Sequence, residues 1–218
     1  MTIKLNDAIK NRRSVRLFLD KKASQEQIRA IIESANYAPS ACNRQAWRFI
    51  VVDDKEKLSL LSDLGGAHFI KKSPQAILIV YSNLTDNFEY QDHIQSASAA
   101  IQNMQLKIFS LGLGSCWIDN LPNKTTVRKI FSIPKTYDPI ALVVFGYPKI
   151  EPKPIRRKLP VEKIMSRNSF DFADSESKSN VYKIIIRKYL RKIYISSPNF
   201  LKKTFLPIVR KFEKRDFS

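Results

Sequence analysis

The chain has 218 residues, 44% of them hydrophobic, which is enough for one domain with a buried core and excludes a disordered chain. Two cysteines exclude a disulfide-rich secreted scaffold, and their surroundings lack zinc-site spacing. The formal net charge is +18, from 38 Lys and Arg against 20 Asp and Glu. Charges close to Met1 and the shortness of every apolar run argue against a signal peptide and a membrane span, so we expect a cytoplasmic protein.

The positive charge is densest near the C-terminus. Residues 165–218 carry 13 basic and 5 acidic side chains. Residues 165–179 are polar, serine-rich and without periodicity, which is typical of a linker. We therefore expect a compact body at 1–164, a linker at 165–179 and a basic helical tail at 180–218.

Helices and strands are expected to alternate along the body, though not strictly. A short helix is expected over Leu5–Asn11. Ser24 and Gln27 have the spacing of a capping box, and the helix that they begin ends before Pro39. Further elements are expected at 48–52 (strand), 58–64 (helix), 76–81 (strand), 92–111 (helix), 115–118 (strand), 125–131 (helix) and 140–145 (strand). This order predicts a layered α+β or mixed α/β fold.

The helix at 92–111 has two notable features. Its apolar residues recur at alternating steps of three and four, which predicts a continuous buried seam. Residues 96–100 are all small, so another backbone or a flat ligand can come close there. A dimer interface would also explain these small residues.

An arginine-rich segment follows the first helix. Arg12, Arg13, Ser14 and Arg16 place three guanidinium groups and a hydroxyl within five residues. Guanidinium groups match phosphate oxygens with two parallel hydrogen bonds, and an extended backbone puts Arg12, Ser14 and Arg16 on one side. The segment is either a phosphate site or a solvated charged turn.

A polar loop precedes the first strand. Ser40, Asn43 and Gln45 offer hydroxyl and amide groups that both donate and accept hydrogen bonds, as a heteroaromatic ring requires. A plain helix–strand connection is the alternative. Cys42 lies in the same loop, and because the sequence places no base beside it, we interpret it as a structural cysteine rather than a nucleophile.

Two further segments have less specific patterns. Gly112 and Gly114 permit close backbone approach before Trp117, but the order of residues does not fit a dinucleotide-binding loop. After Gly146 a proline-rich stretch leads to Arg156 and Arg157, which form a basic loop or the far side of an anion site.

Taken together, these four segments resemble the nitroreductase family of flavin enzymes. The matching motifs are R-R-S-x-R-x-F from Arg12, A-P-S-x-x-N-x-Q-x-W-x-F-x-V from Ala38, G-L-G-S-C-W-I from Gly112 and F-G-Y-P from Phe145. The resemblance extends from about Asp7 to Ile164. It implies an α+β sandwich with a mixed, mainly antiparallel central sheet flanked by helices, and a homodimer with exchanged arms that binds FMN at its interface.

The resemblance also implies which residues contact the cofactor. The residues implied at the FMN phosphate and ribityl chain are Arg12, Arg13, Ser14 and Arg16, with a second charge from Arg156 or Arg157. The residues implied at the flavin ring are Ser40, Asn43 and Gln45, often from the other subunit, and Trp117, Ile118 and Asp119. Ala46 stands where the family commonly has proline, Asn120 where many members have glycine, and Asp119 where some have glutamate, which leaves the substrate open.

The implied chemistry is a ping-pong transfer of hydride from NADH or NADPH through FMN to a nitroaromatic compound, quinone or similar small oxidant. It requires neither a side-chain nucleophile nor a general base, and we assign no catalytic residue and no metal site. His68 stands where it could face the pocket mouth, but a lone histidine is more often a plain surface or core residue. The alternative function is a redox-silent binding protein of the same fold, held by its tail at a membrane or complex.

The tail lies outside the resemblance. From Val181 onward apolar and aromatic residues recur at helical spacing among lysines and arginines. Three interpretations stay open: an arm packed on the other subunit, which we favour, a helix on an anionic membrane surface, and a nucleic-acid contact, which is least favoured because no known nucleic-acid-binding fold is present.

Overall fold

The computed structural model describes residues 3–85, 87, 89–153, 155–172, 182, 185, 186, 189 and 190. The chain divides into two compact units, Met1–Lys153 and Pro154–Ser218. The helices are α1 (Leu5–Asn11), α2 (Gln25–Asn36), α3 (Lys55–Asp63), α4 (Asp92–Ser110) and α5 (Lys124–Phe131), with short 3-10 turns η1 (Ala41–Asn43), η2 (Ile70–Lys72) and η3 (Val161–Lys163). The strands are β1 (Trp47–Val52), β2 (Gln75–Ser82), β3 (Gly114–Ile118) and β4 (Tyr137–Gly146).

The four strands form one sheet in the order β1-β2-β4-β3. Each neighbouring pair is antiparallel, with Ile77 opposite Val143 in β2 and β4 and Trp117 opposite Val143 in β3 and β4. Within the described residues, parallel pairing occurs as an isolated bridge between Ser14 and Ser115. The predicted α+β fold is confirmed, and the predicted elements match those observed to within a few residues at each end.

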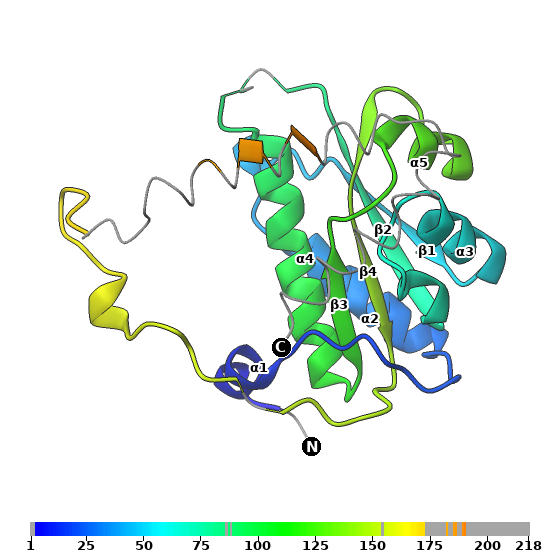
Figure 1. Ribbon diagram of the computed structural model, residues 1–218, viewed down its shortest axis with the longest axis horizontal. Helices are drawn as coiled ribbons and strands as arrows, with labels where there is room; N and C mark the ends of the chain where they lie inside the picture. Colours follow the sequence, from blue (N-terminus) through cyan, green and yellow to red (C-terminus); the bar gives the residue numbers. More distant parts are fainter. Residues whose placement is uncertain are drawn as a thin grey trace. The chain divides into compact units, whose positions relative to one another are not determined.

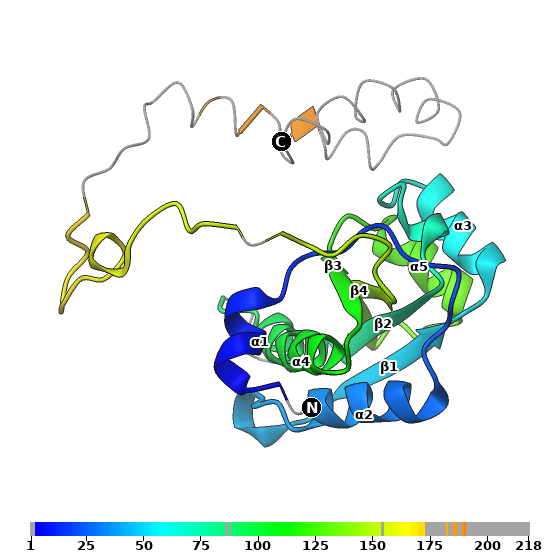
Figure 2. The same ribbon diagram turned by 90° about the horizontal axis from the view of Figure 1, so that it is seen from below.

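Helices cover both faces of the sheet, and each face has its own core (Figure 2). On one face α2 and α4 pack against Ile77, Val143 and Phe145. On the other, α3, η2 and α5 pack against Leu78 and Val144. Because successive strand residues point to opposite faces, two fully covered faces require strands that are continuously apolar, as β2 is.

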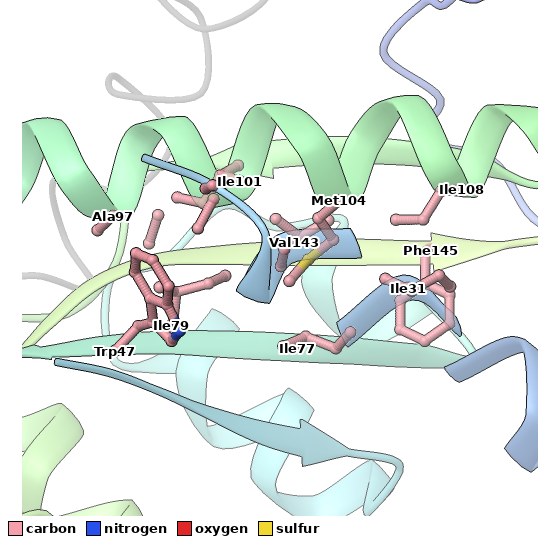
Figure 3. Packing of buried hydrophobic residues seen from close by; sticks show 14 of the residues in the cluster. Ile31, Trp47, Ile77, Ile79, Ala97, Ile101, Met104, Ile108, Val143 and Phe145 are labelled. Carbon is pink, nitrogen blue, oxygen red and sulfur yellow. The ribbon is translucent and has the colours of Figure 1, made fainter. Parts of the chain in front are cut away.

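Helix α4 runs along one face of the sheet, roughly in the direction of the strands (Figure 1). The middle of its predicted seam is confirmed, since Ala97, Ile101, Met104 and Ile108 are fully buried, whereas Ile94 and Leu111 at the ends of the seam are partly buried. Figure 3 shows these side chains directed toward the strands. A buried seam of this length fixes α4 on the sheet, so loops attached to either end of the helix have a rigid support.

Local interactions explain where α2 begins and where α4 ends. Ser24 and Gln27 form the predicted capping box, with Ser24 N donating to Gln27 Oε1 at 2.9 Å and Gln27 N donating to Ser24 Oγ at 3.3 Å. The α4 helix ends where Gly112 adopts a φ of +74°, which favours glycine. These signals are local in the sequence, which is why they predict the element ends.

An ion-pair group ties α5 to the sheet. The Asp138 carboxylate at the start of β4 accepts hydrogen bonds from Lys124, Arg128 and, at 2.9 Å, Asn83. Burial opposes ionisation of Asp138, but these hydrogen bonds and the charges of Lys124 and Arg128 outweigh it and hold the pKa of Asp138 below its usual value. The carboxylate therefore stabilises the folded state at neutral pH.

The second unit is described only in part. Its division from the first falls after Lys153, earlier than the predicted end of the body at residue 164. Residues 173–181 of the predicted linker and tail, and most of the tail beyond them, lie outside the described residues. The boundaries of the linker at 165–179 and of the tail at 180–218 therefore stay predictions.

Candidate functional site

The arginine-rich segment lies along the outer edge of β3. Val15 N donates to Ser115 O at 2.9 Å, and Ser14 forms the parallel bridge with Ser115. Gly114 permits this approach, because a Cβ there would lie 2.7 Å from Val15 Cγ2. The fold thus fixes the backbone of Ser14 and Val15 against a strand and places Arg12 and Arg16 on either side of that attachment.

The guanidinium groups of Arg13 and Arg16 have different surroundings. Arg13 Nη1 donates to the carbonyls of Lys10 and Arg12, each at 2.7 Å, and so closes the end of α1. Arg13 Nε is buried and has no hydrogen-bond partner among the described residues. Arg16 lies over the Phe69 ring, 5.6 Å from its centroid. A cation–π contact of this kind orients the guanidinium group.

Cys116 of β3 lies next to the arginine segment, and side chains of that segment act on its thiol. Burial raises the pKa of the Cys116 thiol, while the charges of Arg16 and Arg12 and a hydrogen bond with Ser14 act in the opposite direction. Cys116 is 3% exposed. Arg12, Arg16 and the Ser14 hydroxyl therefore all act on one position of β3, where the negative charge of Asp119 opposes them.

The end of β3 continues the same site. Trp117 and Asp119 are exposed, and Ile118 between them is buried in the core. The carbonyl of Asn120 accepts a hydrogen bond from Ala67 N at 3.0 Å. This bond joins the end of β3 to the turn that carries His68, which is exposed.

The polar loop before β1 has an unusual backbone. Cys42, Asn43 and Gln45 have φ values of +50°, +53° and +48°, a region that non-glycine residues rarely adopt. Ser40 Oγ accepts from Gln45 N at 3.0 Å, and Gln45 Nε2 donates to Asn43 Oδ1 at 2.7 Å. The loop therefore presents Asn43 and Gln45 to solvent in a conformation that its own hydrogen bonds maintain.

Helix α4 supports this loop from behind. Ser96 Oγ accepts from Ala41 N at 3.0 Å and donates to the Asp92 carbonyl at 2.8 Å. Arg44 Nη1 donates to the Leu84 carbonyl at 2.9 Å. One of the small residues noted in the sequence thus allows a loop of the same chain to approach the helix.

The two parts of the candidate site, the polar loop and the arginine segment, lie at opposite edges of the sheet. The polar loop leads into β1, and the arginine segment pairs with β3, so β2 and β4 stand between them. Three interstrand spacings of about 4.8 Å separate the edge strands by roughly 14 Å. Arg156 and Arg157 are exposed and belong to the second unit, so their convergence with Arg12 stays a prediction.

Comparison with known proteins identifies this architecture. The model of the Nitroreductase family matches residues 9–75 and 59–147, more than half of the chain. The chain belongs to the nitroreductase family.

Individual relatives match about two thirds or more of the chain. A putative NADH dehydrogenase/NAD(P)H nitroreductase of Archaeoglobus fulgidus is 34% identical over 147 residues, 66% of this chain and 84% of the relative. An NADPH-dependent FMN reductase of Bacillus subtilis is 27% identical over 208 residues, 85% of this chain and 83% of its own. The solved structure of an FMN-dependent nitroreductase from Clostridium difficile has 34% identity and a TM-score of 0.66, covering 75% of this chain and 99% of its own.

The structure also shows features that the sequence did not indicate. Phe69 contacts Arg16, although no motif links them. Beside the polar loop lies a hollow with about 250 Å³ of empty volume, part of it open to solvent. Its lining includes the buried Tyr81, whose hydroxyl has no hydrogen-bond partner among the described residues, and His93, whose Nδ1 has none either. Such contacts between distant segments become visible only once the chain is folded.

The described part of the chain contains no group of three His, Cys, Asp or Glu residues able to hold a metal ion. None of its helices is long and apolar enough to cross a membrane.

Proposed function

We propose that this member of the nitroreductase family is an FMN-dependent oxidoreductase that uses NADH or NADPH to reduce small organic oxidants such as nitroaromatic compounds and quinones. The names of its relatives, which include an FMN reductase and an FMN-dependent nitroreductase, support this chemistry. The observation that carries the proposal is the attachment of Ser14 and Val15 to β3, which fixes the backbone between Arg12 and Arg16.

The residues present fit the phosphate end of FMN. Arg13 Nε is a buried donor without a partner among the described residues, and donors of this kind cost free energy unless a ligand or water accepts from them. Arg12 and Arg16 add two positive charges within five residues of the sequence. Phosphate oxygens are the acceptors that such an arrangement of guanidinium groups binds most strongly.

The residues of the polar loop fit the flavin ring of FMN. Asn43 and Gln45 expose amide groups that can both donate and accept, and the positive φ values at Cys42, Asn43 and Gln45 represent backbone strain of the kind that is often retained at binding sites. Support from Ser96 keeps the loop conformation fixed before a ligand arrives.

The separation of the two halves supports a homodimeric site. Because the arginine segment and the polar loop lie at opposite sheet edges, a second copy of the chain can bring its own loop to the ring while the first binds the phosphate. The exposed apolar residues Leu5, Ile9 and Trp117 supply surface for such an interface. We propose that each FMN is bound by the arginine segment of one subunit and the polar loop of the other.

The chain's own part in the reaction is binding and positioning. When bound, FMN would supply the hydride-transfer chemistry between the nicotinamide donor and the oxidant. Arg12, Arg13 and Arg16 would hold the phosphate, and the loop amides would orient the ring and exclude water from its edge. Backbone groups at Ile118 and Asp119 would lie along the ring, so the donor and the oxidant would occupy the remaining open face in turn.

Absorption spectroscopy of the purified protein tests the proposal. We expect a yellow protein with a flavin band near that of free FMN, which anaerobic NADH or NADPH bleaches and a nitroaromatic compound or quinone restores. A protein that binds FMN but is bleached by neither nucleotide would instead be a redox-silent binding protein. A protein that binds no FMN would refute the proposed function.

A further inference from the structure

The second unit exposes a row of apolar side chains on helical backbone. Tyr182, Ile185, Ile186, Tyr189 and Leu190 all have helical conformation and are 43–68% exposed. Their spacing at i, i+3, i+4, i+7 and i+8 puts them on one face of a helix. We call these five residues the apolar stripe. Five large apolar side chains exposed along one face are unusual for a protein surface and indicate a binding surface.

The sequence around the apolar stripe is strongly basic. Residues 181–218 contain eleven Lys and Arg against two Asp and Glu. In the sequence, Lys183, Arg187 and Lys188 alternate with the residues of the stripe. The match to the family model ends at residue 147, before this segment begins, although the FMN reductase of Bacillus subtilis is matched over 85% of the chain.

We infer that the apolar stripe binds the surface of an anionic lipid bilayer. Apolar and aromatic side chains in one row enter the boundary between headgroups and acyl chains, while lysines and arginines beside them pair with lipid phosphates. The combination favours this surface over nucleic acid, whose phosphates need the charge but not the stripe, and over an uncharged apolar groove of a protein, which needs the stripe but not the charge. The segment lies on the membrane rather than crossing it, since its apolar residues are interrupted by charges.

Vesicle sedimentation of the full-length, FMN-loaded protein tests this inference. We expect binding to vesicles of phosphatidylcholine containing about a third phosphatidylglycerol, and little binding to phosphatidylcholine alone. Raising the salt from about 0.1 M to about 0.5 M should weaken the binding, because the electrostatic part is screened. Equal binding to both kinds of vesicle would contradict the role of the basic residues.

Matched leucine substitutions test the apolar stripe itself. Leu190, in the stripe, and Leu60, on α3 of the first unit, are both exposed leucines on helical backbone. We expect Leu190→Ser to weaken vesicle binding about tenfold, from the lost insertion of one leucine, and Leu60→Ser to leave it unchanged.

The FMN content of each variant separates this inference from the proposed function. Leu190→Ser should keep its FMN and its dimeric state. If it instead loses FMN or dissociates while vesicle binding is unchanged, the segment is an arm on the second subunit and the membrane inference is wrong. If both leucine variants bind vesicles as the unmodified protein does, the stripe has no part in lipid binding. An absence of FMN in the unmodified protein would refute the proposed function without affecting the vesicle result.

Discussion

Replacing Gly114 by alanine should displace the arginine segment and weaken flavin binding. A Cβ at this position would lie 2.7 Å from Val15 Cγ2, 2.8 Å from Val15 Cβ and 3.0 Å from Val15 Cγ1. Carbon atoms normally pack at about 3.5–4.0 Å, so Val15 must move outward by roughly 0.8 Å or more. Because Val15 stands between Ser14 and Arg16, its displacement moves both of them.

The expected magnitude follows from the hydrogen bonds at risk. Overpacking of this kind lowers the free energy of unfolding by about 1–3 kcal/mol. A shift near 1 Å removes a charged hydrogen bond to the ligand, which is worth about 1.5–3 kcal/mol. Gly114→Ala should therefore bind FMN roughly 10- to 100-fold more weakly, beyond any loss of stability.

Fluorescence quenching of FMN on titration with apoprotein measures the affinity, and urea unfolding measures the stability. The control is Gly66→Ala, where a Cβ would lie 2.5 Å from the Leu61 carbonyl oxygen and 3.1 Å from Ile70 Cδ1, a comparable overlap whose nearest atoms do not belong to the arginine segment. We expect the control to lose stability and keep its FMN affinity. If Gly114→Ala binds FMN within twofold of the unmodified protein, the arginine segment does not hold the cofactor as we argue.

Three further predictions concern other parts of the first unit. Asp138→Asn should lower the free energy of unfolding at pH 7 by about 1–2 kcal/mol. Because the pKa of Asp138 is lower in the folded state than in the unfolded state, this difference should be present above about pH 4 and be lost as the pH falls through the folded-state pKa. An equal difference at pH 2 and pH 7 would contradict a stabilising role of the ionised carboxylate. Ser96→Ala should weaken FMN binding about fivefold, because it removes the acceptor for Ala41 N. The control is Ser110→Ala, which should leave the affinity unchanged because the Ser110 hydroxyl bonds a carbonyl of its own helix. Equal FMN affinities of the two variants would show that α4 does not support the loop. A thiol reagent should label Cys42 at once and Cys116 only on unfolding, because Cys116 is buried and its pKa is raised; two fast thiols per chain would be the opposite result.

The order of elements could be predicted because its signals are local. The capping pair at Ser24 and Gln27, the apolar run of β2 and the period of α4 each lie within one element, and each matches the structure. The sequence also indicated the polar loop and the arginine segment as candidate sites. It could not place them, because neighbours within the sheet are set by strand order rather than by chain order.

The contacts that the sequence could not predict join distant segments. Arg16 meets Phe69, and Ala41 meets Ser96, across 53 and 55 positions of the chain. The positive φ values at Cys42 and Gln45 were also unexpected, since these residue types favour other conformations. Hydrogen bonds of Gln45 with Ser40 and Asn43 maintain that backbone, and no sequence motif indicates them.

Subunit mixing tests the central claim most directly. One variant carries Arg12→Ala and Arg16→Ala, the other Asn43→Ala and Gln45→Ala, and each alone should bind little FMN. If each site combines the arginine segment of one subunit with the polar loop of the other, a purified heterodimer of the two variants contains one site without any substitution and should bind about one FMN per dimer with near-normal affinity. If each site lies within a single chain, every site in the heterodimer is defective, and failure to recover FMN would contradict the account.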